Sequence, residues 1–322
     1  MMTMIKSCRL LLLVCLSFLL SVVHATEEPV ELWGTDECET VSCRFKAPHR
    51  GTPPQVANQW HQEDEQLWNY VQEHVPDVLE HTGSAAFDEH LKGVQAVLRH
   101  WGAPTYLCHA GLFHSIYGTE GFQGFALPLA QRDGVRALIG ERAEKLAFVF
   151  CMLDRSTFDQ TVMDYDISTT TSNNNTVYTL VARPELGRFE MTLTHDEWLD
   201  FVELTLADWL EQVEGAAVKP NTLYLWDVGQ AFAYRRLAYR KMSRILAQKR
   251  APRLAQMAPQ MYQQVMDTES RNTRHLVQMK TPPQSTAAQV AQDALRAAGE
   301  LDIPIDLAPK PMEEECAAAS VS

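Results

Sequence analysis

The sequence predicts a mainly α-helical fold with one small β-hairpin. Apolar residues make up 46% of the 322 residues, which is enough for a substantial buried core. Over most of the chain these residues recur at steps of three and four, the pattern of one buried helix face. Around residues 176–194 the spacing changes to an alternation of apolar and polar side chains, which is typical of paired strands.

The predicted helices are separated by glycine and proline. The clearest apolar stripe runs from Phe87 to Trp101, and Gly102 and Pro104 divide it from the next helix. The predicted helices span residues 55–80, 87–101, 104–117, 132–138, 141–155, 195–214 and 222–249, with one more helical stretch after Pro252.

The hairpin is predicted from two strands, 176–182 and 188–194, around the turn Pro184-Glu185-Leu186-Gly187. Thr194 and Glu197 fit a capping box, in which each side chain bonds to the backbone N–H of the other residue. The following helix is therefore predicted to begin where the second strand ends.

Residues 1–25 are typical of a secretory signal. Two basic residues precede the apolar run Leu10–Val23, and Val23-His24-Ala25 fits a small-x-small cleavage site. The run is short for a membrane span, which needs about 20 apolar residues, and an uncleaved anchor is the alternative. We expect a mature chain that begins at Thr26 and lacks a transmembrane span. It would be secreted or lie in an endomembrane lumen, and N-terminal sequencing would test this processing.

The rest of the chain divides by composition. Residues 26–54 predict a flexible N-terminal segment, residues 55–270 one helical domain, and residues 271–322 a weakly ordered C-terminal tail. The formal net charge is −13. Because an acidic surface repels phosphate backbones, general nucleic-acid binding is disfavoured.

Cysteine usage agrees with an oxidising compartment. Cys38 and Cys43 lie close together in a loop-like segment and can pair there. Cys108 and Cys151 each lie in an apolar helical run, where a cysteine usually acts as a small core residue. Asn174-Asn175-Thr176 fits an N-glycosylation sequon in a polar loop.

Three side chains that can bind metal lie at the inward edges of three predicted helices: His90, His114 and Asp154. Imidazole nitrogens and a carboxylate suit Mn, Fe or Zn. The alternative is structural, with each histidine making one buried hydrogen bond and Asp154 pairing with Arg155 or another arginine.

The order and spacing of these residues resemble the HD superfamily of metal-dependent phosphohydrolases. The segment Ala110–His114 is similar to the "AxLxHD" segment of guanosine-tetraphosphate hydrolases, and Leu153-Asp154-Arg155 is similar to their "LADR". The segment Gly111–Glu120, GLFHSIYGTE, looks more closely like the signature of an uncharacterised family of domains of unknown function. That resemblance covers roughly residues 84–215.

The resemblance implies an HD-like helical bundle in which His90, His114 and Asp154 hold a divalent ion. The chain departs from the HD pattern at Ser115, which stands where the dyad has its aspartate. The acidic pair that follows the dyad in guanosine-tetraphosphate hydrolases falls on Gly118 and Thr119. The candidate catalytic residues are Ser115, Tyr117, Thr119 and Glu120.

Two arginines are candidates for substrate binding. Arg132 and Arg136 are four residues apart and share a helix face that can receive a phosphate or carboxylate. The alternative is a solvated face paired with Asp133 or Glu141.

Three functions fit these residues. The first is a metal-dependent hydrolase of a phosphorylated small molecule, the second a binding module that kept the pocket and lost the chemistry. The third is a structural or interaction protein. The sequence alone does not choose between an enzyme and a protein without catalytic activity.

Overall fold

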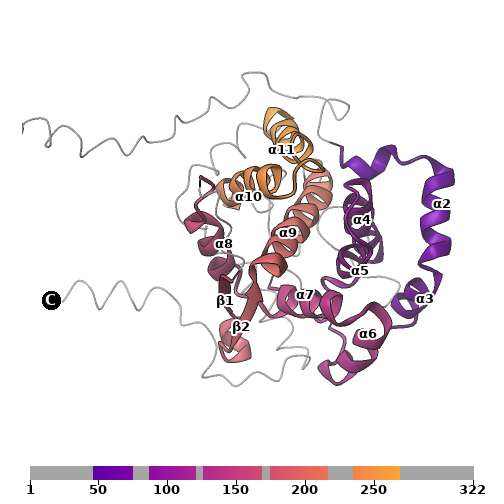
Figure 1. Cartoon of the computed structure of the whole chain (residues 1–322). Coiled ribbons are helices and arrows are strands. Elements are labelled where there is room, and N and C mark those ends of the chain that lie inside the picture. Colours follow the sequence, from indigo (N-terminus) through magenta and orange to yellow (C-terminus); the bar gives the residue numbers. More distant parts are fainter. Residues whose placement is uncertain (1–45, 75–86, 121–125, 169–174, 217–234, 269–322) are drawn as a thin grey trace, which may run out of the picture. The chain divides into compact units, whose positions relative to one another are not determined.

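The computed structural model of the chain describes residues 46–74, 87–120, 126–168, 175–216 and 235–268, which belong to one unit, Asp36–Ser322 (Figure 1). The helices are α2 (Pro54–Glu63), α3 (Glu65–His74), α4 (Phe87–His100), α5 (Thr105–Phe113), α6 (Arg132–Ile139), α7 (Glu141–Met152), α8 (Arg155–Asp164), α9 (His195–Ala216), α10 (Arg236–Lys249) and α11 (Met257–Thr268). The strands are β1 (Val177–Val181) and β2 (Glu190–Thr194). This confirms the mainly α-helical fold with a small hairpin.

Helix α9 is the central element of the described core. It contacts α4, α5, α7, α10 and both strands, and Figure 1 shows it between α10 and α4. Trp198, Phe201 and Trp209 of this helix are fully buried. Burial of a large aromatic side chain contributes several kcal/mol at about 25 cal/mol per Å² of apolar surface. The helix is therefore held from several sides, and its polar side chains lie inside the protein.

Helices α4 and α5 form a closely packed pair. The predicted stripe of α4 is buried, with Phe87, Leu91 and Leu98 almost without exposed surface. The absence of a side chain at Gly111 permits this packing, because a Cβ there would lie 2.6 Å from Leu98 Cδ1. The pair brings His90 on α4 close to the C-terminal end of α5, where His114 follows.

The hairpin forms as predicted, with Val177 opposite Thr194 and Val181 opposite Glu190. The capping box is also confirmed. The Thr194 N–H donates to Glu197 Oε2 at 2.8 Å, and the Glu197 N–H donates to Thr194 Oγ1 at 3.3 Å. These bonds satisfy backbone donors in the first turn of α9 and fix its start at the end of β2.

Helix α7 ends earlier than the sequence predicts. The Arg183 N–H donates to the carbonyl oxygen of Met152, and the Asp154 N–H donates to that of Val181, both at 2.9 Å. The chain therefore leaves the helix at Met152 and runs beside the hairpin. A further helix, α8, which the sequence did not predict, begins at Arg155.

The predicted helix 55–80 is divided at Asp64. This residue separates α2 from α3, and its carboxylate is buried, where it accepts hydrogen bonds from Gln95 at 2.9 Å and Arg99 at 2.6 Å. The two helices therefore meet at a residue whose carboxylate forms a buried ion pair with Arg99.

Several predictions fall outside the described residues. These are the signal segment 1–25, the N-terminal segment as far as residue 45, the pair Cys38 and Cys43, Asn174 of the sequon, residues 75–80 and 222–234 of two predicted helices, and the tail 271–322. Within the described residues, no helix combines the length and the apolar character that a membrane crossing requires.

Candidate metal centre

Three side chains from three helices converge in the core. His90 comes from α4, His114 directly follows α5, and Asp208 lies on α9. Their ligand atoms form a nearly equilateral triangle. The two Nε2 atoms are 3.1 Å apart, and Asp208 Oδ1 lies 3.3 Å from Nε2 of His90 and 3.2 Å from Nε2 of His114. We call this group the metal triad.

The size of the triangle fits one divalent ion. Protein nitrogen and oxygen ligands lie about 2.0–2.2 Å from Zn²⁺. At about 2.1 Å, neighbouring ligands are about 3.0 Å apart in octahedral geometry and about 3.4 Å apart in tetrahedral geometry. The three observed distances fall between these values, so a single ion can contact all three atoms. Such a set would supply three of the ligands of an ion.

The second nitrogen of each histidine is held by an acceptor. His90 Nδ1 lies 2.5 Å from Glu211 Oε2, and His114 Nδ1 lies 2.6 Å from the carbonyl oxygen of Gly111. Because a carboxylate and a carbonyl only accept, Nδ1 carries the proton in both rings. In a neutral ring, Nε2 then presents its lone pair to the triad, the arrangement found in metal-binding histidines, whereas a protonated ring donates from Nε2 to Asp208 instead.

The triad lies in the interior, with His90 1%, His114 0% and Asp208 2% exposed. Burial favours a lower pKa for His90, but the carboxylates of Glu211 and Asp208 outweigh it and raise that pKa to about 9. Burial likewise opposes the shift at Asp208, yet hydrogen bonds from His114 and His90 hold its pKa well below the usual range. The site thus strongly favours a positive charge at its centre, either a proton or a metal ion.

Four acidic residues of α9 are buried, at positions 200, 203, 208 and 211. Asp200 accepts hydrogen bonds from Arg142 and Arg250, and Glu203 pairs with Arg253 through two bonds of 2.6 Å. The two remaining acids are paired with histidines instead. An arginine is a permanent cation, whereas a neutral histidine can bind a metal. The same helix therefore contains two structural ion pairs and one group suited to an ion.

Gly93 makes room for the carboxylate that orients His90. A Cβ at this position would lie 2.6 Å from Glu211 Cγ and 2.7 Å from Glu211 Oε1, closer than real contacts allow. Any side chain here must push Glu211 away from His90 Nδ1.

Gly93→Ala is therefore expected to weaken binding of Mn²⁺ by about 10–100-fold, the usual effect of losing a partner that orients a metal ligand. Metal titration of the purified variant would measure this. Gly134→Ala on α6 is the matched control, because no atom lies within 4 Å of the added Cβ. Equal affinities in the two variants would show that Glu211 does not control His90.

The structure places Asp208 with the histidines, where the sequence predicted Asp154. Asp154 is the N-cap of α8. Its Oδ1 accepts hydrogen bonds from the backbone N–H of Ser156 at 3.1 Å and from the hydroxyl of that residue at 2.5 Å, and its Oδ2 lies 3.4 Å from Arg188. This position follows from the early end of α7, which leaves the aspartate at the start of the next helix. Asp208 was not predicted from the sequence. The available signal was the presence of acidic residues on the apolar helix α9, since such residues need a buried partner.

The predicted catalytic residues lie along the segment after His114. Ser115 is buried in the turn that follows α5, and Tyr117 donates its hydroxyl to Glu144 at 3.3 Å. Thr119 is buried, while 40% of the Glu120 side chain is exposed. Glu120 Oε2 accepts from the backbone N–H of Arg155 at 3.1 Å. None of the four contributes to the metal triad.

The predicted substrate arginines are engaged by one buried acid. Arg132 donates to the two carboxylate oxygens of Glu144 at 2.7 and 3.0 Å, and Arg136 lies 3.4 Å from the same group. Arg136 also donates to Asp133 at 2.8 Å, the pairing expected for a solvated face. Both guanidinium groups therefore already have carboxylate partners.

Cys108 and Cys151 are free and buried, which confirms their prediction as core residues. Burial raises the pKa of each thiol to about 12, so neither is a reactive thiolate at neutral pH. Cys151 donates to the carbonyl oxygen of His114 at 3.0 Å and so supports the backbone at the triad.

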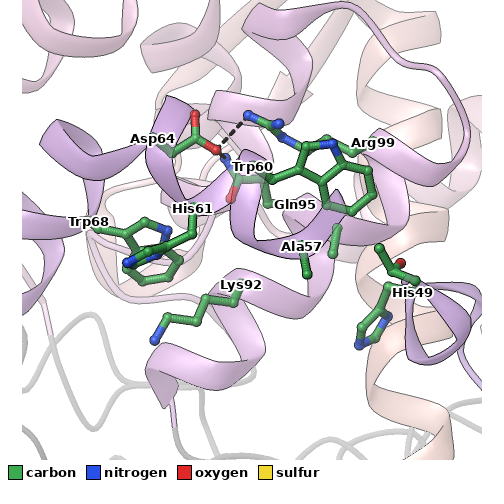
Figure 2. Close-up of a pocket in the computed structure, with 11 residues that line it drawn as sticks. His49, Ala57, Trp60, His61, Asp64, Trp68, Lys92, Gln95 and Arg99 are labelled. Atoms are coloured by element: carbon green, nitrogen blue, oxygen red, sulfur yellow. Dashed lines mark hydrogen bonds and ion pairs between the residues drawn. The ribbon is translucent and has the colours of Figure 1, made fainter. Parts of the chain in front are cut away.

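A separate cavity of about 230 Å³ lies against α2, α3 and α4 (Figure 2). Trp60, Trp68 and His61 form part of its wall. Its buried carboxylate, Asp64, is bound by Gln95 and Arg99, as the dashed lines in Figure 2 mark. No member of the metal triad lines this cavity. Asp64 supplies the one carboxylate among the lining residues, and Gln95 and Arg99 already bind it.

Comparison with known proteins finds one family model that matches part of the chain. Residues 70–155 match the family described as Domain of unknown function (DUF6817). No curated protein and no solved structure matches the chain. The matched segment includes His90, His114 and Ser115 but ends before Asp208. The chain thus contains a region similar to an uncharacterised family of domains, and its metal triad is completed by a helix outside that region.

Proposed function

We propose that this protein is a divalent-metal-dependent hydrolase of a phosphorylated small molecule. The observation that carries the proposal is the triangle of His90 Nε2, His114 Nε2 and Asp208 Oδ1, with sides of 3.1–3.3 Å. Two imidazoles and one carboxylate suit Mn, Fe or Zn.

The composition of the site supports catalysis rather than a structural metal. Structural zinc sites are closed by four protein ligands, whereas catalytic sites keep an open position. Within the described residues, three side chains form the group. A divalent ion bound there would supply Lewis acidity, which polarises a substrate oxygen and makes water a better nucleophile.

The chain supplies the positioning and proton-transfer groups. Glu211 orients His90, as described above. Among the predicted catalytic residues, Glu120 has a partly exposed carboxylate, 3.9 Å from Arg155, which in turn lies 4.0 Å from Asp208. We assign to Glu120 the exchange of a proton with the leaving group or the attacking water.

The second candidate is a binding module that does not catalyse. It is favoured by Ser115, which gives the segment after His114 no carboxylate at the position of the HD dyad aspartate. A site with one carboxylate among three ligands carries less charge than an HD site and binds its ion more weakly.

A phosphoester screen with added Mn²⁺ separates the two candidates. For a hydrolase, the wild type turns over at least one phosphorylated small molecule, and His114→Ala abolishes turnover while elemental analysis shows loss of the metal. For a binding module, the wild type retains metal without turnover, and His114→Ala loses that metal. Absence of metal from the wild type would overturn the metal-centre proposal.

A further inference from the structure

Arg155 is a buried cation beside the metal triad with an unused hydrogen-bonding capacity. The residue is 7% exposed, and its Nε is buried without a hydrogen-bond partner. Its nearest acidic atoms are Asp208 Oδ2, 4.0 Å from Nη1, and Glu120 Oε2, 3.9 Å from Nε. Both distances exceed those of a hydrogen bond.

Other buried arginines in the described part of the chain bind acids directly. Buried Arg235 donates to both carboxylate oxygens of Asp159 at 2.7 Å. Buried Arg183, whose Nε also has no hydrogen bond, has Nη1 3.2 Å from Glu185 Oε1. A buried guanidinium N–H without a hydrogen bond costs free energy, because it has lost water without gaining a partner. Arg155 differs from these two arginines because its nearest acidic atoms lie 3.9 and 4.0 Å away.

The position of Arg155 is fixed without a carboxylate partner. Its guanidinium carbon lies 4.6 Å from the centre of the Phe150 ring, and the same ring packs edge-on against His114. Its backbone N–H is bound by Glu120. These contacts hold the side chain beside the triad and leave its donors for another group.

A second buried polar atom at the triad also lacks a partner. Gln212 donates through Nε2 to Asp208 Oδ1 at 2.5 Å, while its Oε1 has no hydrogen bond among the described residues. Unsatisfied polar groups on two sides of one carboxylate indicate that a polar ligand or water belongs there.

We propose that Arg155 forms an oxyanion subsite, which binds a phosphoryl oxygen of the substrate while another oxygen of the same group contacts the ion held by the triad. The two oxygens of Asp208 support this, since Oδ1 faces the histidines and Oδ2 faces Arg155. The planar guanidinium matches phosphate and carboxylate oxygens. This inference rests on the proposed function and narrows its substrate to an anion bound next to the metal.

Binding of inorganic phosphate to the Mn²⁺-loaded mature chain tests the subsite by calorimetry. We expect the wild type to bind phosphate, and Arg155→Gln to weaken that binding at least 10-fold with an unchanged manganese content. Arg155→Lys should recover part of the affinity through its charge. Arg188→Gln, which removes an exposed arginine that lies 3.4 Å from Asp154, is the control and should bind like the wild type.

The outcomes separate the subsite from the metal centre. Wild-type protein that holds Mn²⁺ but not phosphate, or Arg155→Gln that binds phosphate normally, overturns the subsite and leaves the metal centre standing. Loss of manganese from both Arg155 variants overturns it too, because Arg155 would then support the metal. If the wild type holds no manganese, the proposed function fails. In that case, phosphate binding by the wild type that is lost in Arg155→Gln would still support the subsite, and equal phosphate binding by the two proteins would reject it.

A titration with acetate in place of phosphate shows whether the subsite binds a carboxylate equally well. Tighter binding of acetate than of phosphate would overturn the phosphoryl assignment.

Discussion

Asp208→Asn is expected to reduce the affinity for Mn²⁺ by at least about 100-fold, which exceeds the usual effect of losing a group that only orients a ligand. The substitution keeps the shape of the side chain and removes the charge that the two histidines and the ion share. Elemental analysis after dialysis, followed by metal titration, would measure the loss.

Asp154→Asn is the matched control for this experiment. Asparagine caps helices about as well as aspartate, so α8 should retain its N-cap and the stability should change little. Metal affinity should equal that of the wild type, because Asp154 bonds to Ser156 and not to the triad. Loss of metal in Asp154→Asn, with retention in Asp208→Asn, would reverse the assignment of the third ligand.

Breaking the ion pair between Glu203 and Arg253 is expected to destabilise the protein more than breaking an exposed ion pair. Glu203 is fully buried and receives two bonds of 2.6 Å from Arg253. Arg253→Met leaves a buried carboxylate whose remaining cationic partner among the described residues, Arg250, lies 3.7 Å away. Breaking a buried pair in this way costs about 3–5 kcal/mol, and we expect about 3 kcal/mol because Arg253 is partly exposed. Urea unfolding would measure the difference.

Lys92→Met provides the comparison with an exposed pair. Lys92 and Asp88 are four residues apart on α4 and both partly exposed, so their pairing should contribute less than about 1 kcal/mol. Equal losses in the two variants would show that burial does not determine the strength of these pairs.

The parts of the fold that depend on local sequence could be predicted. The stripe of α4, the hairpin and the capping box at Thr194 are set by side chains a few residues apart, and the structure agrees with them. The approach of His90 to His114 also follows from two consecutive helices joined by a short turn at Gly102 and Pro104. Two of the three triad residues were therefore identified from the sequence.

The third residue depended on contacts between distant segments. Asp154 follows an apolar helix at a suitable spacing, but residues 181 and 183 of the hairpin bind the backbone at the end of α7 and turn the chain away. Asp208 reaches the histidines because α9 packs against α4 and α5. Neither contact is encoded in the spacing of the residues concerned. The buried acids of α9 were the available signal, since a charge on an apolar helix needs a partner.

The distance along the chain between the triad residues makes an ion at this site a cross-link. His114 and Asp208 are separated by α6, α7, α8 and the hairpin, so a bond through one ion closes a long loop of the chain. Closing a long loop restricts the unfolded ensemble more than closing a short one, although the dependence on length is weak. Removal of the ion by a chelator should consequently lower the melting temperature of the whole helical core, because α4, α5 and α9 would lose a cross-link that joins all three. The ion would then stabilise the tertiary structure as well as form part of the site.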